Sequence, residues 1–289
     1  MASPKEIRKR IRSIRNISQI TRAMEMVSAS KMRRAQQRVL ASRPYAQQLE
    51  AMIGDLSAIQ VDSADMAVFP LLEQREIKRS AVILITPDRG LTGPLNSNII
   101  RRAARYITSE SGGREVDVIA VGKKGRDFMV RTRQHVVAAH VGLGDKVELN
   151  DLRPVVQVAI DDFIAGKVDA VHVVFARFVN TLSQVPDVRQ ILPIVRPESA
   201  GEFRDYIFEP SPEAVLASLL PRYVEIQVYQ AMLDSIASEH SARMVAMRNA
   251  SDNAKELGRD LTLSLNKARQ AQITREVSEI AAGAEALKK

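Results

Sequence analysis

The sequence predicts an α/β domain of Rossmann-like type inserted between two long helices that pair as an antiparallel coiled coil. Near both ends of the 289-residue chain, apolar and small residues recur at alternating steps of four and three, which is typical of a helix packed along its length. Between the ends, short apolar runs alternate with helical patterns, as in a mostly parallel sheet with crossover helices. Aromatic residues form only 4% of the chain, which suits closely packed helices.

Residues 4–58 are predicted to form the N-terminal helix, because Pro4 suits a first helical turn and a heptad pattern follows it. From position 28 the predicted seam consists of Ser28, Met32, Ala35, Val39, Ser42, Ala46, Leu49, Ile53 and Leu56. Upstream, apolar residues continue it, with a shift of about one position after the first three: Ile7, Ile11, Ile14, Ile17, Ile20, Met24 and Val27. Pro44 predicts a kink near Arg43.

Residues 213–287 are predicted to form the second helix, with many small residues along its seam. The seam consists of Leu233, Ala237, His240, Met244, Met247, Ser251, Ala254, Gly258, Leu261, Leu265, Ala268 and Gln272. Pro221 is expected to bend or break the start of this helix, because proline removes a helical hydrogen bond.

The middle of the chain predicts the α/β domain. Apolar runs closed by turn residues predict strands at 81–86, 116–121, 136–139, 169–180 and 190–195. Helices are predicted at 95–109, 123–132 and 151–165, the last capped by Asn150 or Asp151. We therefore expect three parts: a coiled-coil helix at 1–58, an α/β foot domain at 75–200 and a second coiled-coil helix at 210–289.

Inserting a domain between two helices brings their inner ends together, so the helices should pair antiparallel. With residue 56 opposite about residue 222, residue 7 would lie opposite about residue 271. About 16 residues of the second helix would then project alone, by roughly 25 Å. That projecting tip carries an apolar stripe, which requires a partner: Ile273, Val277, Ile280 and Leu287.

The net charge of +8 is concentrated at the N-terminus. The first 50 residues contain 12 Lys or Arg and 3 Asp or Glu, whereas the rest of the chain contains 30 and 31. A block of this kind predicts an acidic partner, such as nucleic acid, anionic lipid or an acidic protein surface.

Motifs for chemistry are sparse. The chain has no Cys, which excludes thiol catalysis, disulfides and cysteine-ligated metals, and none of its four His residues belongs to a His-Glu-x-x-His pattern. The Gly-Lys-Lys-Gly stretch at 122–125 follows a strand, but a solvated turn is favoured there over a phosphate site. In the Asp-Arg-Gly-Leu-Thr-Gly motif at 88–93, Asp88 is expected to cap the next segment, and the two glycines to permit a tight turn. We expect no cofactor and no metal.

Motifs along the whole chain resemble those of the gamma subunit of F-type ATP synthases. The resemblance includes Gln-Ile-Thr-Arg-Ala-Met-Glu-Met-Val at 19–27 and Asn-Lys-Ala-Arg-Gln at 266–270. Further matches, in the same order as in the family, occur at residues 7–8, 30–33, 42–45, 88–91, 96–98, 183–186, 222–225, 227–229, 238–239, 242–247, 252–254 and 273–274. Thr92 and Pro94 depart from the more usual Cys and Gly of that turn.

The resemblance implies a non-catalytic central rotor subunit of a proton-translocating ATP synthase. It implies alpha, beta, epsilon and c-ring partners, no nucleic acid or small-molecule substrate, and a peripheral position on the cytoplasmic face of a bacterial plasma membrane. By motif position it assigns contacts with the catalytic ring to Arg22, Ala23, Met24, Arg269, Gln270 and Thr274. It assigns foot contacts with the c-ring to Tyr206, Phe208 and Glu209.

Two other functions are compatible with the residue patterns alone. One is a nucleotide-dependent α/β enzyme with helical arms, which nucleotide binding to the isolated chain would reveal. The other is a basic coiled coil that binds nucleic acid, which would show salt-dependent binding through several phosphate contacts.

Overall fold

The computed structural model describes residues 3–59, 69–195 and 209–286. Its contacts divide the chain into two compact units. We call residues 1–28 with 244–289 the helical unit, and residues 29–243 the sheet unit. Two long helices, α1 (Pro4–Ile59) and α5 (Pro212–Ala286), contribute residues to both units. Both helices were predicted within one residue of these bounds.

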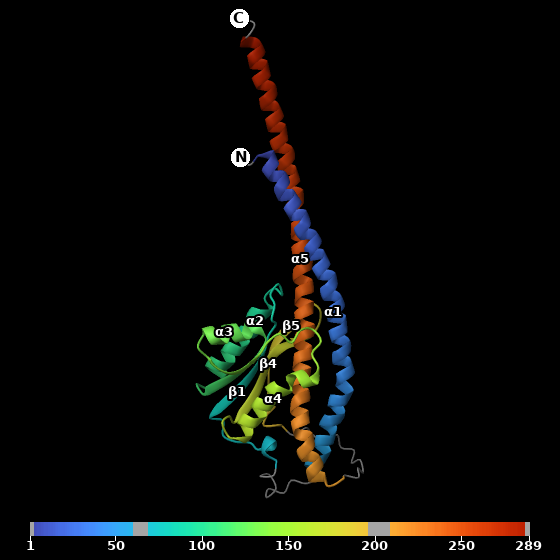
Figure 1. Cartoon of the computed structure of the whole chain (residues 1–289), viewed down its shortest axis with the longest axis vertical. Helices are drawn as coiled ribbons and strands as arrows, with labels where there is room; N and C mark the ends of the chain where they lie inside the picture. The colour runs from blue at the N-terminus through green and yellow to red at the C-terminus, as the bar shows by residue number, and fades with distance from the viewer. Residues whose placement is uncertain (1–2, 60–68, 196–208, 287–289) are drawn as a thin grey trace. The chain divides into compact units, whose positions relative to one another are not determined.

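The sheet unit contains a five-stranded sheet in the order β3-β2-β1-β4-β5 (Figure 1). Its strands are β1 (Arg79–Ile85), β2 (Glu115–Val121), β3 (His135–His140), β4 (Ala170–Phe178) and β5 (Gln184–Leu192). The first four run parallel, and β5 pairs antiparallel with β4. The prediction of a strand at 190–195 was wrong in its bounds, because the first part of β5 is polar and half-buried and has no apolar run to mark it.

Three shorter helices connect the strands: α2 (Leu95–Arg105), α3 (Lys123–Arg131) and α4 (Leu149–Ile164). A π turn, η3 (Tyr106–Glu110), continues α2, and a short 3-10 turn, η2 (Pro70–Leu72), precedes β1. The predicted N-cap of α4 at residue 150 or 151 was wrong. Glu148 is the N-cap, and the carboxylate of Asp151 accepts its backbone N–H at 2.8 Å.

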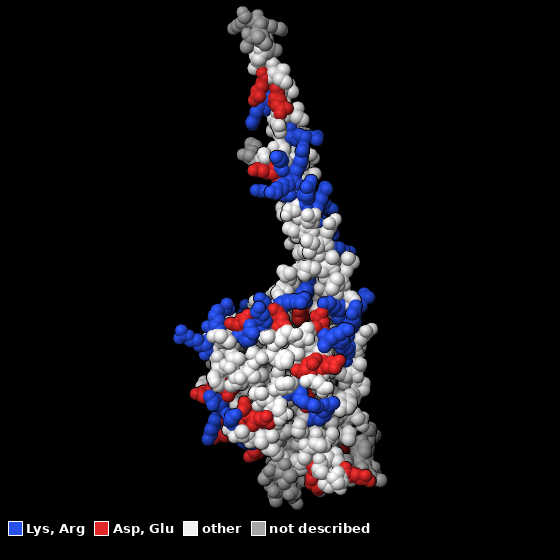
Figure 2. Space-filling view, in the orientation of Figure 1, with Lys and Arg blue, Asp and Glu red and all other residues white. Residues whose placement is uncertain are grey.

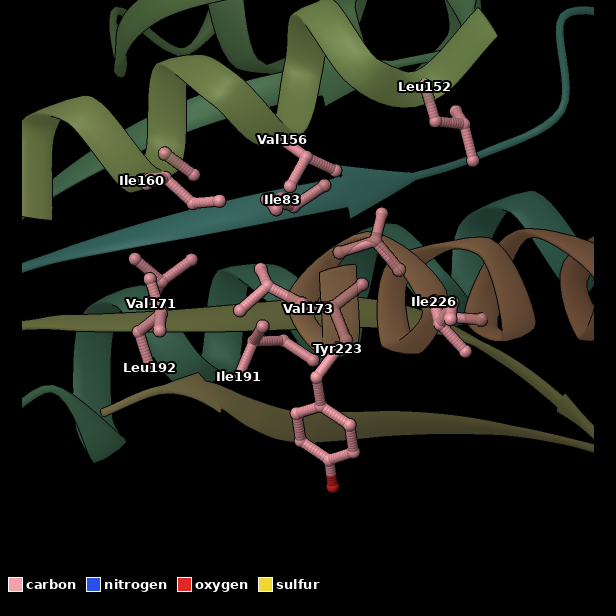
Figure 3. Packing of buried hydrophobic residues seen from close by; sticks show 14 of the residues in the cluster. Ile83, Leu152, Val156, Ile160, Val171, Val173, Ile191, Leu192, Tyr223 and Ile226 are labelled. Atoms are coloured by element: carbon pink, nitrogen blue, oxygen red, sulfur yellow. The ribbon is translucent and has the colours of Figure 1, made fainter. Parts of the chain in front are cut away.

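Alternate residues of the strands face two hydrophobic clusters, as the period of a β-strand requires. On one face, Ile83 and Val173 pack with residues of α4, α1 and α5, part of which is seen in Figure 3. On the other face, Val82 and Val174 pack with α2, α3 and Ala242 of α5. Helix α5 therefore contributes to both clusters.

Within the sheet unit, α1 buries the predicted heptad seam. Ala35, Ala46, Leu49, Ile53 and Leu56 all belong to the large cluster. The predicted break of α5 at Pro221 was wrong, because the helix is continuous from Pro212 to Ala286. The neighbouring Leu220 and Val224 are 2% and 1% exposed, and their packing outweighs the missing hydrogen bond.

In the helical unit, the predicted apolar seam was wrong at four positions. Ile17, Ile20 and Val27 are exposed, at 45%, 60% and 54%, and Met24 is only half-buried. The seam instead keeps the original register and becomes polar after Ile14. It is buried at Ile7, Ile11, Thr21, Glu25 and Ser28 and half-buried at Ile14 and Ser18. Apolar periodicity could not find this seam, because small polar side chains allow two helices to approach without an apolar signal.

The predicted pairing register was also wrong. Gly258 of α5 lies next to Ile14 of α1, since a Cβ placed on Gly258 would lie 3.8 Å from Cγ2 of Ile14. The expected register placed residue 14 opposite about residue 264 instead. In the sheet unit, Arg222 hydrogen-bonds to Tyr45 rather than lying opposite residue 56.

Cysteine pairs can test this register, because the chain contains no cysteine of its own. Ser251 Oγ lies 3.5 Å from the carbonyl oxygen of Ser18. We expect the Ser18→Cys, Ser251→Cys double variant of the full chain to form an intrachain disulfide on mild oxidation, as thiol counting by mass spectrometry would show. The matched pair Ser18→Cys with Asp260→Cys represents the register expected from sequence, and preferential oxidation of that pair would contradict the structure.

Candidate functional site

The carboxyl ends of the parallel strands, where α/β proteins bind ligands, are occupied by the protein's own groups. Pairing of β1 with β4 ends at Leu84 and Val174. Two residues further along β4, the backbone N–H of Ala176 donates to Ser235 Oγ at 3.3 Å, and Ser238 Oγ donates to the Ala176 carbonyl at 3.0 Å. Both serines belong to α5, so this helix takes the place of β1 where β1 has ended.

Asp88, in the distinctive motif after β1, has a structural role. Its two carboxylate oxygens accept the backbone N–H groups of Lys123 at 2.7 Å and Gly142 at 2.9 Å. Asp88 thus caps α3, a later helix than the one expected, and also holds the loop after β3. The turn is formed by left-handed Leu91 and Gly93, with φ of 63° and 56°, rather than by both glycines.

The glycines at 122 and 125 allow α3 to approach β1. Gly122 has φ of 100°, and a Cβ there would lie 1.8 Å from the Thr86 carbonyl oxygen. At Gly125 a Cβ would lie 2.8 Å from Thr86 Oγ1, which accepts the Gly125 N–H. Close packing therefore accounts for both glycines. The expected solvated turn was wrong, because the stretch begins α3 and both glycines are buried.

Three of the four histidines have acidic or phenolic neighbours. Nδ1 of His135 lies 2.7 Å from Asp117, Nδ1 of His172 lies 2.8 Å from the Tyr106 hydroxyl, and Nε2 of His240 lies 3.1 Å from Asp145. Burial lowers the pKa of His172 and of His240 to about 4, so both are neutral at pH 7. Across the described residues, no group of three His, Cys, Asp or Glu could hold a metal ion.

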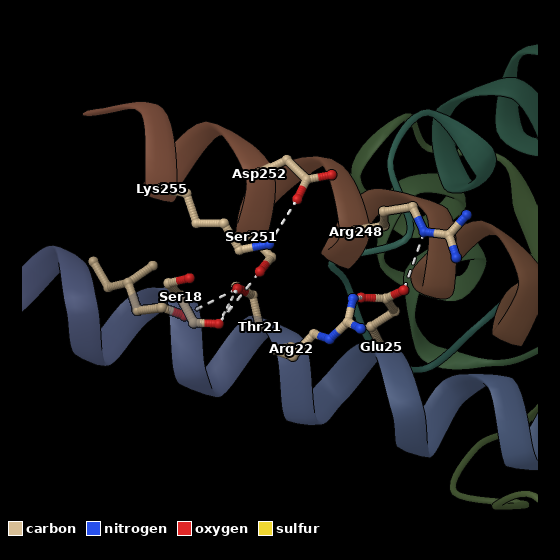
Figure 4. Close-up of polar contacts among 9 residues, drawn as sticks. Ser18, Thr21, Arg22, Glu25, Arg248, Ser251, Asp252 and Lys255 are labelled. Atoms are coloured by element: carbon tan, nitrogen blue, oxygen red, sulfur yellow. Dashed lines mark hydrogen bonds and ion pairs between the residues drawn. The ribbon is translucent and has the colours of Figure 1, made fainter. Parts of the chain in front are cut away.

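The contact between α1 and α5 in the helical unit is polar (Figure 4). Glu25 is buried and accepts hydrogen bonds from Arg22 at 3.0 Å and Arg248 at 3.1 Å. One turn away, Thr21 Oγ1 donates to the Ser18 carbonyl, which also accepts from Ser251. One arginine from each helix thereby compensates the cost of burying the Glu25 carboxylate.

A groove of about 680 Å³ lies between the two helices of the same unit. Its floor includes Ile14 and Gly258, and its lining carries three basic side chains, Arg15, Lys255 and Arg259. Lys and Arg side chains are prominent on the helical pair in Figure 2. This arrangement suits a partner surface that is both apolar and acidic.

The residues predicted to contact other subunits are mostly exposed. Arg22 and Ala23 are exposed and Met24 is half-buried, in the helical unit. Arg269, Gln270 and Thr274 are exposed on α5, as are Ile273, Val277 and Ile280, at 50%, 59% and 72%. Glu209 is exposed in the sheet unit, whereas Tyr206, Phe208 and Leu287 lie outside the described residues.

Some polar contacts were not predicted from the sequence. Sequence alone does not indicate the roles of Glu25, Arg248 and Asp145, because each pairs with a residue distant in the chain. A charged residue at a seam position, as Glu25 is, was the one available signal. Among the described residues, no helix is both long and apolar enough to cross a membrane.

Comparisons with known proteins agree with this architecture. A family model described as ATP synthase matches residues 3–287. ATP synthase gamma chains of Roseiflexus castenholzii and Chloroflexus aurantiacus are 58% and 54% identical, each over 99% of both chains. The gamma chain of Dehalococcoides mccartyi is 49% identical over 99% of this chain and 100% of its own length.

The chain belongs to the ATP synthase gamma chain family. The resemblance noted in its sequence is thereby confirmed. It is a non-catalytic subunit of an F-type ATP synthase.

Solved structures show the same fold. A chain in the central stalk/c-ring structure of the Tetrahymena thermophila mitochondrial ATP synthase aligns with a TM-score of 0.61 and 25% identity, over 80% of this chain and 99% of that one. A chain from the Euglena gracilis mitochondrial enzyme aligns with a TM-score of 0.68 and 19% identity, over 98% and 94%. The combination of two end helices with an inserted α/β domain is therefore shared with these solved structures.

Replacing Gly122 by Ala should destabilise the sheet unit strongly, because the new Cβ meets a backbone carbonyl at a positive φ. We expect a loss of about 3 kcal/mol or more in the free energy of unfolding of the full chain, measured by urea denaturation. Gly113→Ala is the control, since Gly113 has φ of 76° but an open surrounding; about 1 kcal/mol is expected there. Equal effects of the two substitutions would contradict the close packing at Gly122.

The buried His240 should make stability fall with acidity. Its pKa is about 4 in the folded chain and about 6.5 when unfolded, so the unfolded state gains a proton first as the pH falls. The stabilisation that comes from keeping His240 neutral is present above pH 6.5 and is lost as the pH falls to 4. The free energy of unfolding should fall by about 3 kcal/mol over that range. His240→Gln should flatten the decline in that window, measured by urea denaturation. An equally steep decline in this variant would contradict the role of His240.

Proposed function

We propose that this gamma chain couples rotation of the c-ring to conformational changes in the catalytic subunits. The observation that carries the proposal is that α5 is one helix of 75 residues whose side chains are all exposed from residue 269 to residue 283. A continuous helix transmits twist along its length, and an exposed end of this kind requires surrounding partners. The chain performs no chemistry in this scheme.

Each part of the chain would have its own position in the assembled complex. Residues 1–58 and 210–289 would form the coiled coil inside a ring of alpha and beta subunits, and residues 75–200 would form the foot. Tyr206, Phe208 and Glu209 would lie near the c-ring, with the epsilon subunit beside the foot. The resemblance of the foot segment to that of the family supports this placement. The assembly would lie on the cytoplasmic face of a bacterial plasma membrane.

Two sets of residues would meet the ring of alpha and beta subunits. The lower set is Arg22, Ala23 and Met24, of which Arg22 and Ala23 line a second groove between the helices. The upper set is Arg269, Gln270 and Thr274, whose exposed polar groups can hydrogen-bond to loops of the ring subunits. Basic groups spread along a helix can meet acidic loops of successive subunits during a turn, because the attraction extends over about 8 Å at physiological salt.

The end of α5 would turn as a bearing in an apolar sleeve. Ile273, Val277 and Ile280 are all at least half exposed in the chain alone, and Leu287 would continue the stripe. Contacts between apolar surfaces have little directional preference, so they resist rotation less than a set of specific hydrogen bonds would.

Purification tests the proposal. The tagged chain, co-expressed with the alpha, beta, epsilon and c subunits from the same genome, should co-purify with all four. If the tagged chain were recovered without alpha and beta, the proposed function would be excluded.

A substitution at Arg269 tests the upper contacts. In membrane vesicles containing the assembled enzyme, Arg269→Ala should lower the rate of ATP synthesis by about tenfold, since losing a charged hydrogen bond costs roughly 1.5 kcal/mol. Arg101→Ala is the matched control, because Arg101 is exposed on α2 of the sheet unit. Equal rates for the two variants would argue against a role for Arg269.

A further inference from the structure

The loop between β3 and α4, residues 141–148, contacts both long helices within the sheet unit. Lys31 of α1 donates to Asp145 Oδ2 at 2.5 Å, and Arg38 of α1 donates to the Asp145 carbonyl at 3.1 Å. Nε2 of His240, on α5, lies 3.1 Å from Asp145 Oδ1. One residue of the loop thus contacts α1 twice and α5 once.

The loop that carries Asp145 is held rigidly. Near its start, the N–H of Gly142 bonds to Asp88, which also caps α3. Near its end, Val147 is 2% exposed, and Glu148 forms the capping box of α4. Gly142 and Gly144 have φ of 82° and 69°, so the path of the loop depends on conformations that favour glycine.

The charges around Asp145 favour its ionised form. Burial raises the pKa of this carboxyl, but the hydrogen bond from Lys31 and the neighbouring His240 outweigh burial and lower the pKa overall. A second pair lies close by on α5, where Arg243 donates to Glu239 at 2.6 Å and to the Gly90 carbonyl at 3.4 Å. Loops from the carboxyl ends of β1 and β3 therefore both contact the same stretch of α5.

This contact lies at the limit of the sheet unit. The unit begins at residue 29 in α1 and ends at residue 243 in α5, and Lys31 and His240 are two and three residues inside those limits. A force that turns the α/β domain must pass into both helices before they leave the unit. α5 is packed into both hydrophobic clusters there, whereas Lys31 and Arg38 tie α1 directly to the domain's loop.

We propose that Asp145 is a positioning residue that fixes α1 and α5 to the α/β domain, so that the two helices turn with the domain as one body under torque. The inference rests on the proposed function, since it assigns to Asp145 a part in transmitting rotation. It concerns stiffness rather than folding, because an ion pair with exposed partners adds little to global stability. Loss of Asp145 should therefore reduce the coupling of ATP hydrolysis to proton pumping only when the rotor works against a proton gradient.

The test uses the assembled enzyme in membrane vesicles and compares ATP-driven proton pumping with ATP hydrolysis. For Asp145→Ala we expect the number of protons pumped per ATP, measured against an established proton gradient, to fall at least about twofold. After an uncoupler collapses the gradient, ATP hydrolysis should equal that of the wild type. A folding defect would instead lower the uncoupled hydrolysis as well, and that result would overturn the proposal.

Three variants sharpen the comparison. Asp127→Ala removes an exposed carboxylate that pairs with the adjacent Arg126 at 2.7 Å, and it should pump like the wild type. Asp145→Glu keeps the charge and should restore most of the coupling. In Lys31→Cys with Asp145→Cys, a short bismaleimide bridge should raise pumping against the gradient above that of the unbridged variant.

The outcomes separate this inference from the proposed function. If wild-type vesicles failed to pump protons on adding ATP, the coupling role of the whole chain would fail. If wild-type vesicles pumped and Asp145→Ala pumped equally well at every gradient, only the role of Asp145 would be overturned.

Discussion

Packing of α5 against the sheet is the interaction on which the rest of the sheet unit depends. The helix contributes Ile236 and Ala237 to one hydrophobic cluster and Ala242 to the other. Ser235 and Ser238, which flank Ile236 and Ala237, hydrogen-bond to the backbone of Ala176 beyond the end of β1. These small hydroxyl side chains let the helix come close enough to act as a partner of the strand. The position where a related fold would bind a ligand is thus used to hold a helix.

The same helix makes a different kind of contact in the helical unit. There the seam with α1 includes small polar side chains and the buried Glu25, which accepts from Arg22 and Arg248. Removing a carboxylate from water is costly, so this contact depends on keeping both arginines in place. Hydrogen bonds fix register more strictly than apolar packing does, and Ile17, Ile20 and Val27 remain exposed for contact with other surfaces.

Much of the fold could be predicted from residue patterns, and the failures have definite physical causes. The parallel strands were found because strands covered on both faces form apolar runs, as in Ala81–Ile85. β5 was misplaced because it is an edge strand with polar residues in its first half. The seam near Ile17 was misplaced because apolar periodicity does not detect a polar contact. The candidate contact residues came from family motifs, and most of those that the structure describes are exposed.

Residue patterns were enough to predict the two end helices, the inserted α/β domain, the basic N-terminal block and the family. Those properties depend on local periodicity, composition and motif order, which a single chain carries in full. The register of the helices, the polar seam at Glu25, the serine contacts with β4 and the bridging position of Asp145 became visible in three dimensions. Each of these joins residues far apart in the chain, and the energy of such a pair depends on distances that no local pattern specifies.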